Sequence, residues 1–132
     1  MPRKVLLIDD DEDDAQFFFD AIKDLALDMT MEYCSGGQQA LDKLSRNKSI
    51  HAPDIIFLDL NMPALNGWEC LREIKKIAGM QHIPIVMYST ANLYQEGVSP
   101  EDVGATAFYQ KSNSFSELKT SLAALLKSVL PY

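Results

Sequence analysis

Five short apolar runs recur along the chain, and each is followed by a longer segment of mixed composition. Several of these runs are apolar throughout instead of alternating, a pattern typical of strands covered on both faces, as in a parallel sheet. They are also rich in β-branched and aromatic residues, which favour strands. The predicted strands cover residues 4–8, 31–34, 54–58, 83–88 and 106–110.

The segments between the strands place apolar residues at the spacing of an α-helix. Such a stripe predicts a helix that lies with one face against the sheet. Three stripes are clear, and their residues are Ala15, Phe18, Phe19, Ile22 and Ala26; Trp68, Leu71, Ile74 and Ile77; and Phe115, Leu118, Leu122, Leu125, Leu126 and Val129.

Two further helices have weaker signals. Ser35 is predicted to cap a helix that begins in "GGQQALDKL", because a serine hydroxyl can accept a hydrogen bond from the first turn of a helix. The stretch 91–104 contains Gly97 and Pro100, so we expect its helix to be short or mobile.

Five strands, each followed by a helix, predict an α/β fold: a (βα)5 doubly wound parallel sheet with right-handed crossovers. The sequence shows no linker and no low-complexity tract, so residues 1–132 are expected to form a single domain. In such sheets, ligands bind beyond the carboxyl ends of the strands, where the strand order reverses.

The net charge of −7 argues against nonspecific binding to nucleic acid or to an anionic membrane, since both require a basic surface. No apolar run is long enough to span a bilayer, and "MPRKVLLIDD" is too short and too soon acidic for a signal peptide. We therefore expect a cytoplasmic protein whose partner is a protein or a metal ion.

Polar residues follow the predicted strands at the positions where ligands bind in this fold class. The carboxyl ends of parallel strands meet at one edge of the sheet, so we expect these side chains to converge there. They comprise carboxylates, hydroxyls and one ammonium: Asp9, Asp10, Asp59, Ser89, Thr90 and Lys111.

Asp59 follows the apolar run "DIIFL", where burial of a carboxylate is costly without compensation. An aspartate in this position often only caps the next turn, but Asp9, Asp10 and Lys111 are expected beside it. Three carboxylates and one lysine leave two negative charges, which a divalent cation would neutralise, and oxygen ligands favour Mg²⁺. A carboxylate in such a site can also act as a nucleophile and form an aspartyl phosphate.

Six consecutive acidic residues follow the first strand, and they divide into two groups. Asp9 and Asp10 belong to the predicted metal site. Residues 11–14 fall at the cap and in the first turn of the next helix, where negative charge interacts favourably with the helix dipole.

The motifs "LLIDDD", "IIFLDLNMPALNG", "IPIVMYSTA" and "GATAFYQK" occur in this order. Together they resemble the receiver domains of two-component response regulators, in particular the stand-alone type found in chemotaxis, and the resemblance extends from Lys4 to Val129. It implies a flavodoxin-like three-layer sandwich with strand order 2-1-3-4-5, an order for which the chemotaxis regulator is itself a standard example.

The resemblance implies a phosphoacceptor and a Mg²⁺ site. Asp59 matches the phosphoacceptor, which also ligates the metal. Asp10 would bind the ion directly, Asp9 mainly through water, and Asn61 through its backbone carbonyl.

The resemblance also implies which residues respond to the phosphoryl group. Lys111 matches the family's lysine, and Ser89 matches its hydroxyl residue, with Thr90 next to it. Phe108 matches the aromatic switch position on the last strand.

The sequence departs from the family pattern at four positions. Ser112 follows Lys111 where the family usually has proline behind a cis bond. Because a cis bond before a non-proline residue costs roughly 3 kcal/mol, we expect either a trans bond with a shifted loop or a strained bond. Ser89 replaces the commoner threonine and keeps the donor, Phe108 lacks the hydroxyl of a tyrosine, and Asn66 stands where aspartate is frequent.

The family's function is to receive a phosphoryl group from a sensor histidine kinase or a histidine phosphotransfer protein, and to signal through a downstream protein. Such a domain catalyses only its own phosphotransfer and dephosphorylation, so we do not expect an enzyme that acts on other substrates. Receivers commonly dimerise, and a homodimer is therefore one expected assembly.

Two other interpretations stay open. Asp9 and Asp11 superficially match the DxD motif of Mg²⁺-dependent phosphatases of the haloacid-dehalogenase kind, although Asp13 stands where that family has threonine or valine. The chain could also be a binding module that keeps the receiver fold without phosphorylation, an interpretation for which Ser112 leaves room.

Overall fold

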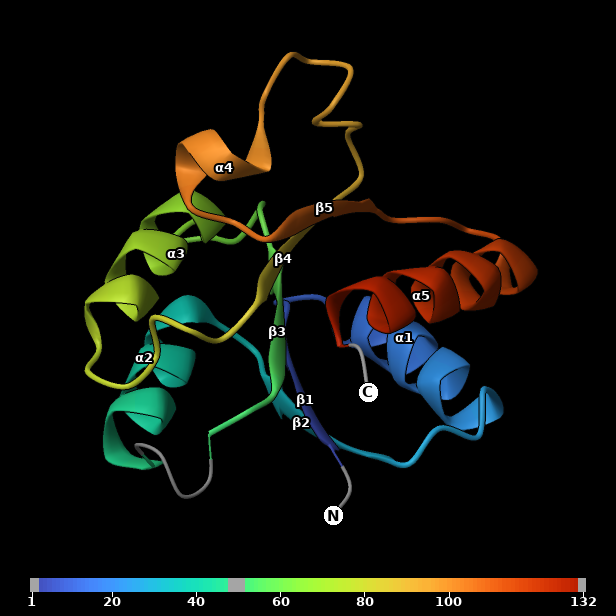
Figure 1. Ribbon diagram of the computed structural model, residues 1–132, viewed down its shortest axis with the longest axis horizontal. Coiled ribbons are helices and arrows are strands. Elements are labelled where there is room, and N and C mark those ends of the chain that lie inside the picture. The colour runs from blue at the N-terminus through green and yellow to red at the C-terminus, as the bar shows by residue number, and fades with distance from the viewer. Residues whose placement is uncertain (1–2, 48–51, 131–132) are drawn as a thin grey trace.

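The computed structural model describes residues 3–47 and 52–130, which contain one five-stranded parallel sheet (Figure 1). The strand order is β2-β1-β3-β4-β5, which confirms the predicted doubly wound topology. The strands are β1 Arg3–Ile8, β2 Met29–Cys34, β3 Ile55–Asp59, β4 Ile85–Ser89 and β5 Ala107–Gln110.

The two central strands β3 and β4 are buried along their whole length, which explains why their sequences are apolar without alternation. Both end one residue later than predicted, so Asp59 and Ser89 close their strands instead of following them. The edge strand β2 is half-buried over most of its length and begins at Met29, before the predicted start, because its polar residues weaken the apolar pattern.

Helices cover both faces of the sheet and complete the expected three-layer sandwich. Figure 1 shows α1 and α5 on one face and α2, α3 and α4 on the other. Their bounds are α1 Glu12–Asp24, α2 Gly37–Asn47, α3 Gly67–Lys76, α4 Pro100–Val103 and α5 Phe115–Val129.

Each face of the sheet has its own hydrophobic core, built from the predicted helical stripes. Under α1, the fully buried ring of Phe18 packs edge-on against Phe57, with the ring centroids 4.9 Å apart. Ala26 does not belong to this stripe: α1 ends at Asp24, and Ala26 is exposed with a φ of 54°. The stripe therefore stops at Ile22.

The weakly predicted helices differ in outcome. The fourth helix is short, as expected, because Pro100 occupies its first turn and Gly104 ends it with a φ of 84°. The predicted capping role of Ser35 is wrong. The Ser35 hydroxyl and backbone N–H both donate to Gln39 Oε1, at 3.1 and 2.7 Å. The serine is therefore a donor to the glutamine side chain.

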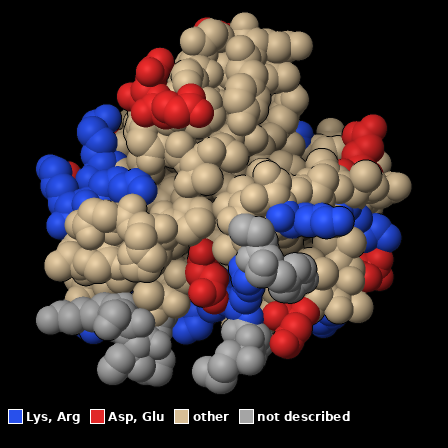
Figure 2. Space-filling model, viewed as in Figure 1, with Lys and Arg blue, Asp and Glu red and all other residues tan. Residues whose placement is uncertain are grey.

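Within residues 3–47 and 52–130, no helix is both long and apolar enough to cross a membrane. On the face shown in Figure 2, lysines and arginines form small separate groups and no broad basic area. This distribution agrees with the negative net charge of the chain.

Candidate functional site

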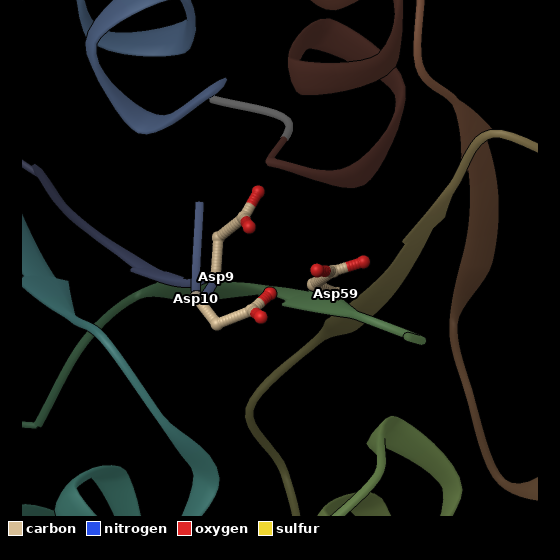
Figure 3. A group of neighbouring side chains, drawn as sticks. All are labelled: Asp9, Asp10 and Asp59. Atoms are coloured by element: carbon tan, nitrogen blue, oxygen red, sulfur yellow. The ribbon is translucent and has the colours of Figure 1, made fainter. Parts of the chain in front are cut away.

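Three carboxylates meet where the neighbouring strands β1 and β3 end, and we call them, together with Lys111, the acidic site. Asp9 and Asp10 follow β1 directly, and Asp59 closes β3. Each aspartate has one carboxylate oxygen that lies within 4.8 Å of the corresponding oxygens of the other two (Figure 3). The structure thus brings together the acids that the sequence analysis selected.

Asp9 is fully buried, whereas Asp10 is exposed. Asp9 Oδ1 accepts a hydrogen bond from the Asp11 N–H at 2.9 Å, and its Oδ2 lies 3.2 Å from Lys111 Nζ. Burial nevertheless raises the pKa of Asp9 above its usual value. The local structure therefore holds this carboxylate in a fixed place at an electrostatic cost.

Asp59 is 3 % exposed, and its Oδ1 accepts a hydrogen bond from the Asn61 N–H at 3.2 Å. Burial, with the added repulsion of Asp9, raises the pKa of Asp59 to about 7. Without a cation, the site therefore opposes full ionisation of its acids near neutral pH. A bound cation would relieve this cost.

The turn after β3 fixes the backbone of Asp59, and sequence reasoning did not single out the glycine on which it depends. The Gly67 N–H donates to the Leu60 carbonyl at 2.9 Å. Asn66 caps α3 through a capping box, since its Oδ1 accepts from the Glu69 N–H and its own N–H donates to Glu69 Oε1. Asn66 is therefore the N-cap of α3 in this chain.

Lys111 lies just after β5 and reaches the acids with its ammonium group. Its Nζ is 2.9 Å from Asp14 Oδ2, 3.2 Å from Asp9 Oδ2 and 3.5 Å from Asp59 Oδ1. Burial alone would lower the pKa of Lys111, but the hydrogen bond to Asp14 and the charges of Asp9 and Asp59 raise it above its usual value. Lys111 is therefore a cation throughout the neutral range. It also lies over the Tyr88 ring, with Nζ 4.8 Å from the ring centroid.

The loop after Lys111 keeps a trans peptide bond before Ser112, since the described residues contain no cis peptide bonds. The serine has its own role in this loop. Its hydroxyl donates to Glu117 Oε2 at 3.1 Å and accepts from the Ser114 N–H, also at 3.1 Å. Ser112 therefore organises the turn into α5.

The two predicted hydroxyl residues differ in burial. Ser89 is 1 % exposed, and its Oγ accepts a hydrogen bond from the Ala91 N–H at 3.1 Å, which leaves the hydroxyl proton for another acceptor. Thr90 is exposed, and its carbonyl accepts from Gln110 Nε2. Of the two, Ser89 has the buried and fixed position.

Phe108, the predicted switch residue, is buried on the opposite face of the sheet from α1. Its ring packs edge-on against Trp68, with centroids 6.3 Å apart, and tilted against Tyr94 at 5.2 Å. The Phe108 N–H donates to the Tyr94 hydroxyl at 3.2 Å. Tyr94, which is 56 % exposed, thus links the loop after β4 to the outer edge of β5.

The donor set suits a hard divalent cation. The acidic site offers carboxylate oxygens from three aspartates, whereas the two free cysteines, Cys34 and Cys70, are buried in the core among apolar residues. The DxD pattern of Asp9 and Asp11 does not form a second arrangement, because Asp11 Oδ1 accepts from the Asp13 and Asp14 N–H groups as the cap of α1. This geometry removes the main argument for the phosphatase interpretation.

Comparison with known proteins agrees with the fold. The response regulator Rcp1 of Synechocystis sp. is 25% identical over 120 residues, which cover 89% of this chain and 82% of Rcp1. The response regulator MprA of Mycobacterium sp. (strain KMS) is 28% identical over 131 residues, and this chain spans only 54% of its length. The structure of the phosphorylated cyanobacterial phytochrome response regulator RcpA superposes with a TM-score of 0.82 at 24% identity, covering 99% of this chain and 96% of RcpA.

The family match extends over most of the chain and includes every residue of the acidic site. Residues 5–123 match the family described as response regulator receiver domain. Together with the parallel sheet, the clustered aspartates and the adjacent lysine, this match shows that the chain belongs to the response regulator receiver domains of two-component systems.

Proposed function

We propose that Asp59 is the phosphoacceptor of this receiver domain. The observation that carries the proposal is the position of its buried carboxylate, which has a pKa raised to about 7 and lies beside two further aspartates and 3.5 Å from Lys111. A carboxylate oxygen of Asp59 forms a bond to phosphorus while the bond from phosphorus to the donor's imidazole nitrogen breaks. The imidazole leaves with the bonding electron pair and takes up a proton.

We propose Mg²⁺ as the cation of the acidic site. Asp10 and Asp59 would hold it directly, Asp9 mainly through water, and Asn61 through its carbonyl. When bound, the ion supplies positive charge that stabilises the oxygens of the transferring phosphoryl group. The all-oxygen ligand set and the raised pKa values of Asp9 and Asp59 support this assignment.

Lys111 and Ser89 would bind the phosphoryl group after transfer. The ammonium of Lys111 is the cation nearest to Asp59 among the described residues, and it can donate to one phosphoryl oxygen. The Ser89 hydroxyl would donate to another oxygen, at the end of the strand next to β3. Thr90, beside it, is exposed, and we expect it to influence access to the site instead of binding directly.

The output would be a change in protein contacts. Phe108, which lies three residues before Lys111 on β5, packs between Trp68 and Tyr94 and could report the state of the site to that surface. The donor would be a sensor histidine kinase or a histidine phosphotransfer protein, and the readers a downstream protein or a second copy of the chain. We expect this exchange in the cytoplasm, an environment compatible with the free cysteines. The domain would catalyse only its own phosphorylation and dephosphorylation.

Binding of beryllofluoride, which mimics a phosphoryl group, tests the proposal. We would titrate the protein with beryllofluoride in millimolar Mg²⁺ and follow bound fluoride by 19F NMR. Binding is expected in the wild type and in Asp28→Asn, which changes an exposed residue just before β2. It is expected to be lost in Asp59→Asn and after chelation of Mg²⁺.

Two results would overturn the proposal. One is the absence of any bound fluoride in the wild type at millimolar Mg²⁺. The other is Mg²⁺-dependent hydrolysis of p-nitrophenyl phosphate that Asp9→Asn abolishes and Asp59→Asn retains, a result that would favour a phosphatase.

A further inference from the structure

The carboxylate nearest to the Lys111 ammonium belongs to Asp14, which is not one of the candidate metal ligands. A lysine ammonium has three N–H donors. In this structure two of them make hydrogen bonds, to Asp14 Oδ2 at 2.9 Å and to Asp9 Oδ2 at 3.2 Å, while Asp59 lies farthest, at 3.5 Å. The Lys111 ammonium is thus nearer to Asp14, at the rim of the site, than to Asp59, the proposed phosphoacceptor.

The local structure fixes Asp14 in the position from which it reaches Lys111. Its backbone N–H donates to Asp11 Oδ1 at 3.2 Å in the capped first turn of α1, and the neighbouring Ala15 is buried against the sheet. The side chain of Asp14 is 42% exposed, compared with 13% for Lys111. The pair therefore spans the boundary between the buried site and solvent.

We infer that Asp14 is a positioning residue that draws the Lys111 ammonium toward the rim and competes with the phosphoryl group for it. The inference rests on the proposed phosphorylation of Asp59. A phosphoryl group on Asp59 carries more negative charge than one carboxylate, so Lys111 turns to it and leaves Asp14 to solvent. Asp14 thereby sets how readily the site accepts a phosphoryl group.

The affinity for beryllofluoride at saturating Mg²⁺ measures this competition. Asp14→Asn removes the charge that holds Lys111 at the rim, and we expect it to tighten beryllofluoride binding about two- to fivefold, the size typical of one partly exposed ion pair. Asp13→Asn is the matched control, because it makes the same change of charge in the same helical turn at an exposed residue that does not contact Lys111. The affinity of Asp13→Asn for beryllofluoride is expected to equal that of the wild type.

A double-mutant cycle tests whether the effect passes through the lysine. In a Lys111→Met background, where beryllofluoride binds more weakly, Asp14→Asn is expected to have no further effect on affinity. A merely structural role of Asp14 in α1 would give the same change in both backgrounds.

The inference is overturned if Asp14→Asn weakens beryllofluoride binding, if Asp13→Asn tightens it equally, or if the effect persists without Lys111. A wild-type protein that binds no beryllofluoride would instead overturn the proposed function. The two failures are therefore distinguishable in one set of titrations.

Discussion

The Gly67 backbone packs directly against the backbone of Asp59. A Cβ atom added at Gly67 would lie 2.5 Å from the Asp59 carbonyl oxygen and 2.6 Å from the Cα atom of Leu60. Both neighbours are backbone atoms, so no side chain could turn aside to make room. The first residue of α3 and the proposed phosphoacceptor therefore hold one another in place.

Gly67→Ala is expected to lower the free energy of unfolding by about 1–3 kcal/mol, because the added methyl group must displace backbone. Urea denaturation measures this change. Gly36→Ala is the matched control, since a Cβ there meets no atom within 4 Å and the φ angle lies outside the left-handed region. Equal stability of the two variants would show that the close approach at Asp59 is not tight.

Asp59→Asn is expected to stabilise the metal-free protein at neutral and alkaline pH. The unfolded chain loses the Asp59 proton near the ordinary pKa of 3.8, whereas the folded protein keeps it until the pKa of about 7. The unfolded state therefore binds fewer protons between these values, and stability falls as the pH rises through this window.

We expect Asp59→Asn to raise the free energy of unfolding by about 1–3 kcal/mol at roughly pH 8. The gain should be much smaller near pH 4, because the folded state binds the proton there and the unfolded state has lost only part of it. Urea denaturation in the presence of a chelator at the two pH values gives the comparison. Asp28→Asn serves as the exposed control. A gain of the same size at both pH values would contradict the electrostatic explanation.

The capping box at the start of α3 is expected to contribute measurably to stability. Asn66→Ala removes the acceptor for the Glu69 N–H and should cost about 1 kcal/mol, whereas Asn66→Asp keeps a capping oxygen and should cost much less. Thermal unfolding followed by circular dichroism compares the two variants. If both lose the same amount, the cap is not the source of the effect.

The Tyr94 hydroxyl is expected to protect the outer edge of β5. Tyr94→Phe keeps the ring contact with Phe108 but removes the acceptor for its N–H, so exchange of the Phe108 amide should accelerate by about fivefold. Hydrogen exchange followed by NMR measures this rate. The Lys111 amide, which donates to the carbonyl of Ser89 at the end of β4 at 2.7 Å, is the internal reference and should not change.

Most of the fold follows from the pattern of apolar residues. The buried strands β3 and β4 and the long stripe of α5 were predicted within two residues, because burial on both faces of a strand or along one face of a helix leaves a direct mark on the sequence. The strand order came only from the family resemblance. Pattern alone does not encode which strands are neighbours.

The parts that the sequence did not reveal depend on contacts between distant segments. Asp14 is one of four acids at the start of α1, and this position alone explains why an acid occurs there. Only the contact with Lys111, 97 residues away in the sequence, distinguishes Asp14 from Asp13. Tyr94 lies in a segment without a helical pattern, and its partner is the edge of β5. Gly67 belongs to an evident turn, but its contact with Asp59 requires the folded chain.

Phosphorylation of Asp59 is the central claim, and the most direct measurement is the position of the covalent adduct. We would incubate the protein with acetyl phosphate and Mg²⁺ and locate the phosphoryl group by peptide mapping with mass spectrometry. The account predicts a single Mg²⁺-dependent adduct on Asp59, present in Asp28→Asn and absent from Asp59→Asn. An adduct on another residue, or no adduct with Mg²⁺ present, would contradict it.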